Sequence, residues 1–162
     1  MKKCLFAGTF DPITTGHTAV IEKAIKLFDE VVVAVCHNTA KKTYFPLEVR
    51  LKAVEDACRG YKNVKVMHYE GFVVDLMKSE GIEYNLRGIR NGADYEYETE
   101  MHRVNSYLYK GMTTLFLPCE TENEKVSSTL VRELIRCGKD FSAFVPTACY
   151  GILEEEVKKR KA

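Results

Sequence analysis

The sequence lacks the short motifs that identify several large classes of enzyme. It contains no GxxxxGK[ST], no GxGxxG and no GxSxG segment. The first absence excludes a P-loop nucleotide hydrolase, the second leaves a dinucleotide-dependent dehydrogenase without support, and the third removes the usual hydrolase elbow. A ligand site must therefore be found from its place in the fold.

The sequence also lacks an excess of charge of either sign. Its formal net charge is +1, so it offers no broad basic field for the phosphates of a nucleic acid, and any anionic ligand must be caught locally. The apolar run in MKKCLFAG breaks at Gly8, and a charged helix follows it. We therefore expect neither a signal peptide nor a membrane span, and a cytoplasmic protein without nucleic-acid or membrane partners.

The cysteines never fall in a CxxC pair. Six of them are spread through apolar runs, which is typical of small buried thiols rather than zinc ligands or a disulfide framework. This usage predicts a reducing compartment. The residues are Cys4, Cys36, Cys58, Cys119, Cys137 and Cys149.

Apolar strand-like runs alternate with amphipathic helix-like runs along the whole chain, which predicts one α/β domain over residues 1–162 with a parallel sheet. We expect strands at 5–7, 31–36, 64–69, from Tyr84 onward, and at 113–118. We expect helices at 15–28, from Pro46 to before Gly60, at 73–80 and at 94–109, with two more after residue 118. The final EEEVKKRK is expected to be a solvated helix end with Glu to Lys pairs.

Ligands of an open α/β sheet lie beyond the carboxyl ends of its strands, so the segments after each strand matter most. The first strand is followed by GTFDPITTGH, in which Gly8 lets a ligand approach the backbone and Pro12 stiffens the turn. The next helix begins near Thr15, so His17 in its first turn can share a phosphate with the free amides. The alternative is a capping turn with an incidental histidine.

Two further segments after strands carry lysines or hydroxyls. Lys41 and Lys42 follow the second predicted strand and are either phosphate ligands or solvated surface. Ser127, Ser128 and Thr129 open a helix, as simple caps or as a second anion site on the same rim.

RGIRNGADYEYE places Arg87 and Arg90 beyond the fourth predicted strand. Planar guanidinium groups suit the clamping of phosphate oxygens, and the glycines on either side leave room for a bulky ligand. The alternative is ion pairing with Asp94, Glu96 or Glu98, which we expect for one arginine rather than for both.

Two of these segments resemble known signatures. TFDPITTGH resembles the [HT]xGH signature of the nucleotidyltransferase superfamily, and SSTLVRE resembles its serine-rich second signature. The combination of GTFDPxTxGH, KK followed by F, RGxRxxxDxEYE and SSxLVRE resembles the bacterial phosphopantetheine adenylyltransferase family, collinearly from Lys3 to about Pro146.

This resemblance implies a Rossmann-like open parallel five-stranded sheet with helices on both faces. It also implies ATP and Mg²⁺ as co-substrate and cofactor, 4′-phosphopantetheine as acceptor, and dephospho-coenzyme A and pyrophosphate as products. A homohexamer and coenzyme A as a feedback ligand are further implications. The sequence departs from the family pattern at Ala7, near Asn123 and at Thr129, where the family usually has proline, an aromatic residue and a third serine.

Carried over position by position, the resemblance assigns roles to individual residues. It implies nucleotide contacts from Thr9, Phe10, His17, Gly88, Ile89, Arg90, Glu98, Asn123, Glu124, Lys125, Val126, Ser127, Ser128 and Thr129. It implies phosphopantetheine contacts from Thr9, Lys41, Val73 and Arg87. We expect catalysis to depend on His17, Lys41, Arg90 and Ser128, and we assign no protein ligand to the metal.

The expected reaction is an in-line attack without a covalent intermediate, because the rim offers no candidate nucleophile and a phosphate needs no general base. Two alternatives remain open at this point. One is a nicotinate mononucleotide adenylyltransferase, and the other is an adenine-nucleotide sensor that binds without turnover.

Overall fold

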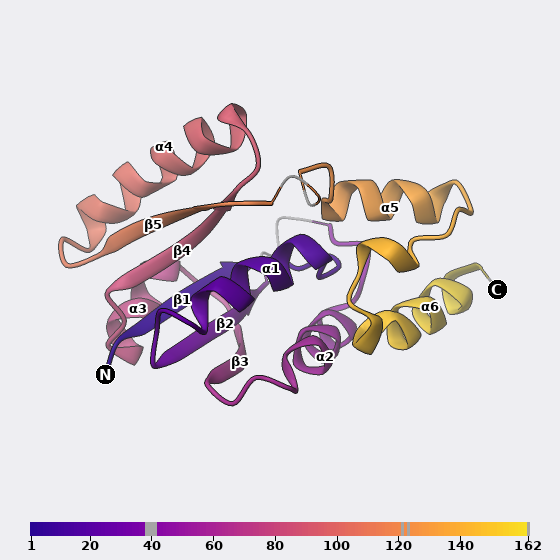
Figure 1. Ribbon diagram of the computed structural model, residues 1–162, viewed down its shortest axis with the longest axis horizontal. Helices are drawn as coiled ribbons and strands as arrows, with labels where there is room; N and C mark the ends of the chain where they lie inside the picture. The colour runs from indigo at the N-terminus through magenta and orange to yellow at the C-terminus, as the bar shows by residue number, and fades with distance from the viewer. Residues whose placement is uncertain (38–41, 121, 123, 162) are drawn as a thin grey trace.

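The computed structural model describes residues 1–37, 42–120, 122 and 124–161 of the chain. Its centre is a parallel sheet of five strands in the order β3-β2-β1-β4-β5 (Figure 1). The strands are β1 (Lys3–Gly8), β2 (Glu30–Cys36), β3 (Val64–Tyr69), β4 (Tyr84–Ile89) and β5 (Thr113–Pro118). The fold is therefore the Rossmann-like open sheet that the sequence predicts.

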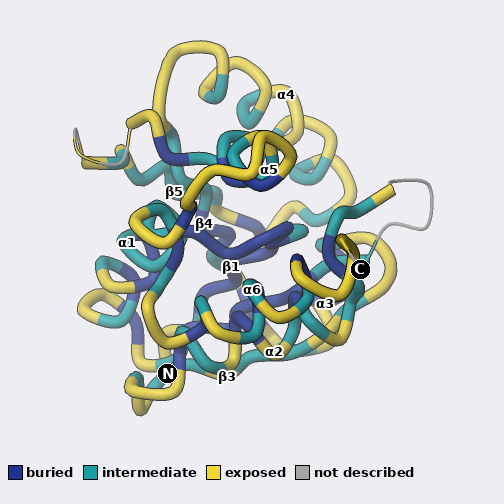
Figure 2. Tube along the Cα trace, turned by 90° about the vertical axis from the view of Figure 1, so that its right-hand side faces the viewer, coloured by how far each residue is buried: buried dark blue, intermediate teal, exposed yellow. Residues whose placement is uncertain are grey.

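Alternate residues of β1 point to opposite faces of the sheet and enter two separate cores. Cys4 and Phe6 belong to the larger core, whereas Leu5 and Ala7 belong to the smaller one. Both faces are buried, which explains why β2 is an almost uninterrupted apolar run. In Figure 2 the central strands are accordingly among the darkest parts of the chain.

Helices cover both faces of the sheet. The larger core holds side chains from α1 (Thr15–Ala24), α2 (Leu47–Cys58), α5 (Ser128–Arg136) and α6 (Thr147–Lys161). The smaller core holds side chains from α3 (Val73–Glu80). The fourth helix, α4 (Gly92–Leu108), packs against β4 and β5, and a short 3-10 helix, Ser142–Phe144, precedes α6.

Two helices differ from their predicted ranges for local reasons. The helix expected over 15–28 ends as an α-helix at Ala24, because the following amides of Lys26 and Leu27 bond carbonyls three residues back. The helix expected from Asp94 already begins at Gly92, because Asn91 caps it by accepting from the Asp94 amide at 3.0 Å.

Cysteine burial follows the prediction only in part. Cys4, Cys58 and Cys149 are buried, and burial raises the pKa of the Cys4 thiol to about 12. Cys36 and Cys119 are half-buried, and Cys137 is exposed on the end of α5, so the expectation of six buried thiols is wrong for these three.

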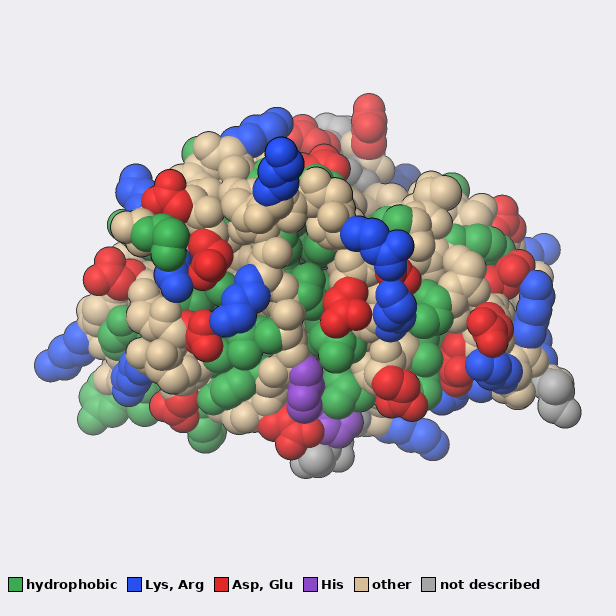
Figure 3. Space-filling model, turned by 90° about the horizontal axis from the view of Figure 1, so that it is seen from below, with side chains coloured by type: hydrophobic (Ala, Val, Ile, Leu, Met, Phe, Trp, Pro, Cys, Tyr) green, Lys and Arg blue, Asp and Glu red, His purple; other side chains and the backbone are tan. Residues whose placement is uncertain are grey.

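The surface carries charges of both signs close together. The face seen in Figure 3 shows basic and acidic side chains interspersed rather than gathered by sign. On α6 the expected pairs are formed one helical turn apart, as Glu154–Lys158, Glu155–Lys159 and Glu156–Arg160. None of the helices in the described ranges combines the length and the hydropathy that a membrane span requires.

Candidate active site

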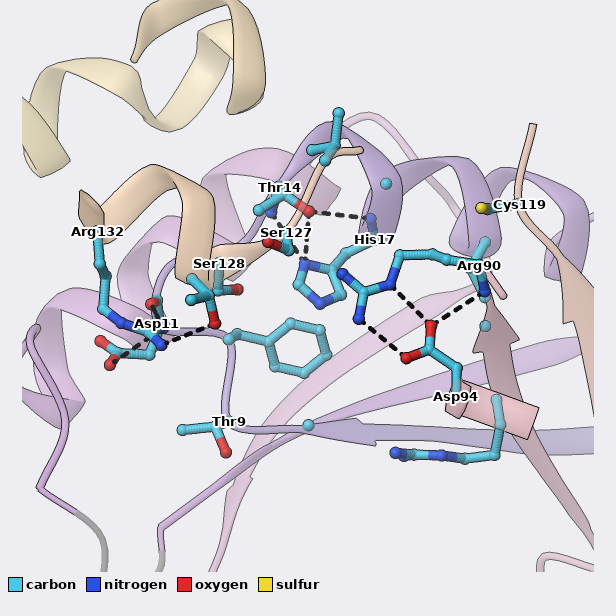
Figure 4. Close-up of a pocket in the computed structure, with 18 of the residues that line it drawn as sticks. Thr9, Asp11, Thr14, His17, Arg90, Asp94, Cys119, Ser127, Ser128 and Arg132 are labelled. Carbon is cyan, nitrogen blue, oxygen red and sulfur yellow. Dashed lines mark hydrogen bonds and ion pairs between the residues drawn. The ribbon is translucent and has the colours of Figure 1, made fainter. Parts of the chain in front are cut away.

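A cavity of about 560 Å³ opens at the carboxyl ends of β1 and β4 (Figure 4). β1 is the centre of the sheet, with β2 on one side and β4 on the other, so the order of the strands reverses here. Such a reversal leaves a crevice between loops that run to opposite sides. The cavity is lined by the turn after β1, the end of β4 and the start of α5.

His17 lies in the first turn of α1 and closes a capping box with Thr14. The Thr14 hydroxyl accepts from the His17 amide, while His17 Nδ1 accepts from the Thr14 amide at 3.0 Å. Glutamate or glutamine usually fills the position of His17 in this motif. The predicted alternatives, a phosphate ligand and a capping residue, are therefore not exclusive, because Nδ1 forms the cap and the ring also lines the cavity.

The surroundings of His17 favour the uncharged imidazole. Its pKa is lowered to about 4, mainly by burial and in addition by the nearby positive charges of Arg90 and Arg87. The ring of Phe10 packs edge-on against the imidazole, with 5.0 Å between ring centroids. Phe10 is itself held in the left-handed region at φ 48°, a strained conformation of the kind that clusters at ligand sites.

Both arginines of the predicted clamp form ion pairs with α4. Arg87 donates to both carboxylate oxygens of Glu98, at 2.7 and 2.6 Å, and to the Ala7 carbonyl at 2.7 Å. Arg90 donates to both oxygens of Asp94, at 2.8 and 3.1 Å. The sequence favoured such a pair for one arginine only, and that expectation is wrong.

Gly88 makes room for α1 as well as for a ligand. A Cβ atom at this position would lie 2.9 Å from Val20 Cγ2, closer than packed carbon atoms approach. The glycine between the two arginines thus allows the first helix to approach β4. This packing is a second reason for glycine, beyond the ligand space that the sequence suggested.

The start of α5 forms the opposite wall of the cavity. Ser127 caps the helix by accepting from the Leu130 amide at 3.1 Å, and the Ser128 hydroxyl donates to the Pro12 carbonyl at 2.7 Å. The first amides of an α-helix have no partners within the helix and carry partial positive charge. The cavity therefore lies between the N-termini of two helices, α1 and α5.

Two residues that the sequence did not indicate hold the turn after β1 against the segment before α2 and against α5. The buried carboxylate of Asp11 accepts from the amides of Tyr44 and Phe45, each at 2.8 Å. Arg132 donates to the Asp11 carbonyl at 2.6 Å and lines the cavity. The only signal for either residue was its presence inside the quoted TFDP and SSTLVRE segments.

Arg50 is a further residue that sequence reasoning missed. It is fully buried on α2 and donates to the Thr9 carbonyl at 2.7 Å and to the Phe45 carbonyl at 3.2 Å. This bonding supports the turn after β1 from behind. The apolar periodicity of α2 gave no indication that an arginine would be in the core.

Comparisons with known proteins agree with this geometry. A sequence profile of the cytidylyltransferase-like family matches residues 5–134. A phosphopantetheine adenylyltransferase of Methylacidiphilum infernorum is 42% identical, covering 100% of this chain and 95% of the relative. Another, of Flavobacterium psychrophilum, is 40% identical, covering 91% of this chain and 97% of the relative.

The chain belongs to the phosphopantetheine adenylyltransferase family. A solved structure from Vibrio parahaemolyticus, described provisionally as a nicotinate-nucleotide adenylyltransferase, has a TM-score of 0.70 and covers 97% of this chain and 95% of its own. Its sequence identity is 24%, so it shows a common fold and nothing about the substrate.

Most positions that the phosphopantetheine adenylyltransferase resemblance singled out come together in the cavity. Those lining it are Thr9, Phe10, His17, Arg87, Gly88, Arg90, Glu98, Val126, Ser127, Ser128 and Thr129. Four others lie outside its lining, namely Val73, Ile89, Glu124 and Lys125. Lys41 and Asn123 fall outside the described residues.

Position in the fold explains two of the four exceptions. Val73 begins α3 and packs against the smaller core, on the other face of the sheet from α1. Ile89 is the last residue of β4, where its backbone pairs with the neighbouring strand β5. Glu124 and Lys125 are exposed in the turn before α5.

Proposed function

We propose that this chain transfers the adenylyl group of ATP to 4′-phosphopantetheine, giving dephospho-coenzyme A and pyrophosphate. One observation supports this above the rest. A histidine with a hydrogen-bonded Nδ1 lies in a cavity between a helix start and an arginine, as a polyphosphate site requires. The substrate follows from the names of relatives about 40% identical over nearly the whole chain.

The reaction proceeds by in-line attack of the phosphopantetheine phosphate on the α-phosphorus of ATP. A bond forms from the attacking phosphate oxygen to that phosphorus, the bond to the bridging oxygen breaks, and pyrophosphate leaves with the electron pair. The attacking phosphate is already ionised at neutral pH, so no proton has to be removed. Orientation and charge stabilisation then supply the catalysis.

The carboxylates of the cavity fit a reaction without a general base. Among the described lining residues they are Asp11, Asp94 and Glu98. Asp11 accepts from two backbone amides, and the other two accept from arginines. Each is thus committed as a hydrogen-bond acceptor and holds an ion pair or a turn in place.

His17, Arg90 and the start of α5 surround the reacting phosphorus in this proposal. His17 donates from Nε2 to an oxygen of the α-phosphate, and the Arg90 guanidinium takes part of the charge of the leaving pyrophosphate. The Ser128 hydroxyl is already donating to Pro12, so Ser128 would act through its backbone amide. Thr9, Phe10, Gly88, Ile89, Glu98 and residues 123–129 complete the nucleotide contacts.

The acceptor lies on the other side of the turn after β1. Lys41 binds its phosphate, Thr9 and Arg87 contact it, and Val73 lines the channel for its pantetheine arm. Arg87 donates three of its five N–H groups to Glu98 and the Ala7 carbonyl, which leaves two for a phosphate. Coenzyme A carries the same pantetheine arm and is proposed as a feedback ligand of this cavity.

Mg²⁺ enters the proposal bound to ATP. Among the residues that the structure describes, no three His, Cys, Asp or Glu side chains gather where they could hold a metal ion. The donor set of the cavity fits Mg²⁺ held by phosphate oxygens and water, since this ion keeps several waters and commonly binds through substrate phosphates. When bound, it neutralises part of the triphosphate charge.

A homohexamer is part of the same proposal. α4 lies at an edge of the molecule (Figure 1). Every residue of this helix is described and none is buried, although several have large apolar side chains. Tyr97, Val104 and Tyr107 expose 61%, 51% and 85% of their surface. A row of this kind favours burial against further copies of the chain.

The test is substrate choice. Purified protein with ATP and Mg²⁺ should release pyrophosphate on addition of 4′-phosphopantetheine and not on addition of nicotinate mononucleotide. Activity with nicotinate mononucleotide alone would overturn the assignment. ATP binding measured by calorimetry, together with no pyrophosphate from either acceptor, would support a nucleotide sensor instead.

A further inference from the structure

The Asp94 carboxylate accepts three hydrogen bonds from Arg90. The Arg90 Nε and Nη2 groups donate to its two carboxylate oxygens at 2.8 and 3.1 Å, and the Arg90 amide donates to Oδ2 at 3.1 Å. The Asp94 amide is itself fixed by the side chain of Asn91. The backbone of Asp94 is therefore fixed at the start of α4, and its side chain is free to accept from the arginine.

The pairing limits the freedom of a side chain that would otherwise move. The Arg90 side chain is 38% exposed, whereas that of Asp94 is 22% exposed. An unpaired arginine at the surface samples many rotamers, and ordering it on binding costs free energy. Two parallel N–H to oxygen bonds select one orientation of the guanidinium plane.

The bonds to Asp94 leave the arginine able to bind a phosphate. A guanidinium has five N–H groups, and two of those of Arg90 donate to Asp94. The rest of the group lines the cavity beside His17 (Figure 4), and its positive charge contributes to the lowered pKa of that histidine. Arg90 can thus contact an anion without leaving its carboxylate.

We propose that Asp94 is a positioning residue for the adenylyl transfer, which holds the Arg90 guanidinium beside His17 in the orientation that meets the leaving pyrophosphate. The inference rests on the proposed function. Asp94 lines the cavity, and in this proposal it acts through Arg90.

Charge and positioning predict opposite outcomes when Asp94 is changed. Asp94 is an anion at a site for an anionic substrate, so its removal should strengthen ATP binding if only charge mattered. If its role is positioning, the loss of one of its two oxygens frees the guanidinium, and the transition state loses an oriented donor. Asp94→Asn is the informative variant, because it keeps the size and one oxygen.

The experiment is a double-mutant cycle on kcat and on the KM for ATP, with Asp94→Asn, Arg90→Ala and the double variant. Asp94→Asn should lower kcat roughly 10- to 100-fold, the scale of a displaced catalytic group. In the Arg90→Ala background it should change kcat by less than about twofold, because the residue through which it acts has gone. Asp94→Glu should recover part of the loss.

Glu100→Gln is the matched control, since Glu100 pairs with Arg103 on the same helix and both side chains are largely exposed. It should leave kcat unchanged. The inference would be overturned if Asp94→Asn lowered kcat by the same factor in the wild-type and the Arg90→Ala backgrounds. Tighter ATP binding with an undiminished kcat would also overturn it. An inactive wild-type protein would instead overturn the proposed function, so the two failures are distinguishable. Thermal midpoints of all variants separate lost activity from lost folding.

Discussion

His17 Nδ1 accepts a hydrogen bond from the backbone amide of Thr14 at 3.0 Å. A backbone amide can only donate, so Nδ1 must be without a proton, and the neutral ring carries its hydrogen on Nε2. The capping box therefore selects the tautomer that can donate into the cavity. A single side chain completes the first turn of α1 and supplies a directed N–H group.

The first prediction separates these two tasks of His17. His17→Ala should lower kcat by roughly 10²- to 10³-fold, as when one transition-state donor is removed, with a much smaller change in the KM for ATP. His17→Gln should retain more activity, because glutamine can cap the helix and still donate from its amide nitrogen. Steady-state pyrophosphate release measures both.

His17→Glu provides the control for capping. Glutamate restores the usual capping box but has no hydrogen to donate when ionised. It should keep the thermal midpoint close to that of the wild type and remain as inactive as the alanine variant. Substantial turnover by the glutamate variant would show that His17 only completes the helix.

The second prediction concerns pH. The pKa of His17 is lowered from 6.5 to about 4, first by burial and then by Arg90 and Arg87. Between these values the unfolded chain binds a proton that the folded chain does not, so the free energy of unfolding falls as the pH falls from 6.5 towards 4. Above pH 6.5 both states are neutral at this position and the effect vanishes.

Proton NMR of the ligand-free protein should show one of the four histidines titrating near pH 4, and His17→Gln should remove that signal. The same variant should lose less unfolding free energy than the wild type on acidification, by on the order of 1 to 3 kcal/mol. A His17 signal that titrates near 6.5 would contradict the buried, neutral imidazole.

The third prediction tests the contact between Gly88 and α1. Gly88→Ala should lower the free energy of unfolding by about 1 to 3 kcal/mol, the usual cost of overpacking, because the new methyl group meets Val20 Cγ2 at 2.9 Å. Val20→Ala removes that methyl group. The double variant should therefore lose less stability than the sum of the single variants, as measured by urea denaturation. Strict additivity would show that the two positions do not touch.

The fourth prediction tests the exposed apolar row on α4. Val104→Asp should shift the protein to a smaller oligomer in light scattering, because a carboxylate would be buried without a partner. A single chain does not bury Val104, which is 51% exposed, so the thermal midpoint of the dissociated form should change little. An unchanged mass would place the interface between copies elsewhere.

The sequence predicted the elements well where the signal was local. A run of β-branched residues identifies β2. Gly81 is the C-cap of α3, and Gly60 follows Arg59, the C-cap of α2. The carboxyl ends of parallel strands lie at the same edge of a sheet. The sequence therefore also predicted that His17, Arg87, Arg90 and Ser128 lie on one rim. The structure puts all four in the lining of one cavity.

Partner choice could not be predicted in the same way. The sequence offered three candidate carboxylates, Asp94, Glu96 and Glu98, and the packing of α4 against β4 decides which of them face the arginines. Asp94 and Glu98 are one turn apart and half-buried towards the strand, whereas Glu96 is exposed on another side of the helix. The fit of two arginines to two carboxylates depends on that packing, which periodicity alone does not show.

Arg132 donates to the carbonyl of Asp11 across 121 positions of the chain, and Ser128 reaches Pro12 across 116. The ribosome therefore makes the two walls of the cavity more than 100 residues apart. All five strands have emerged before the first residue of α5, and domains begin to fold while synthesis continues. A nascent chain can assemble its sheet early, but the cavity has both of its walls only after α5 has been made.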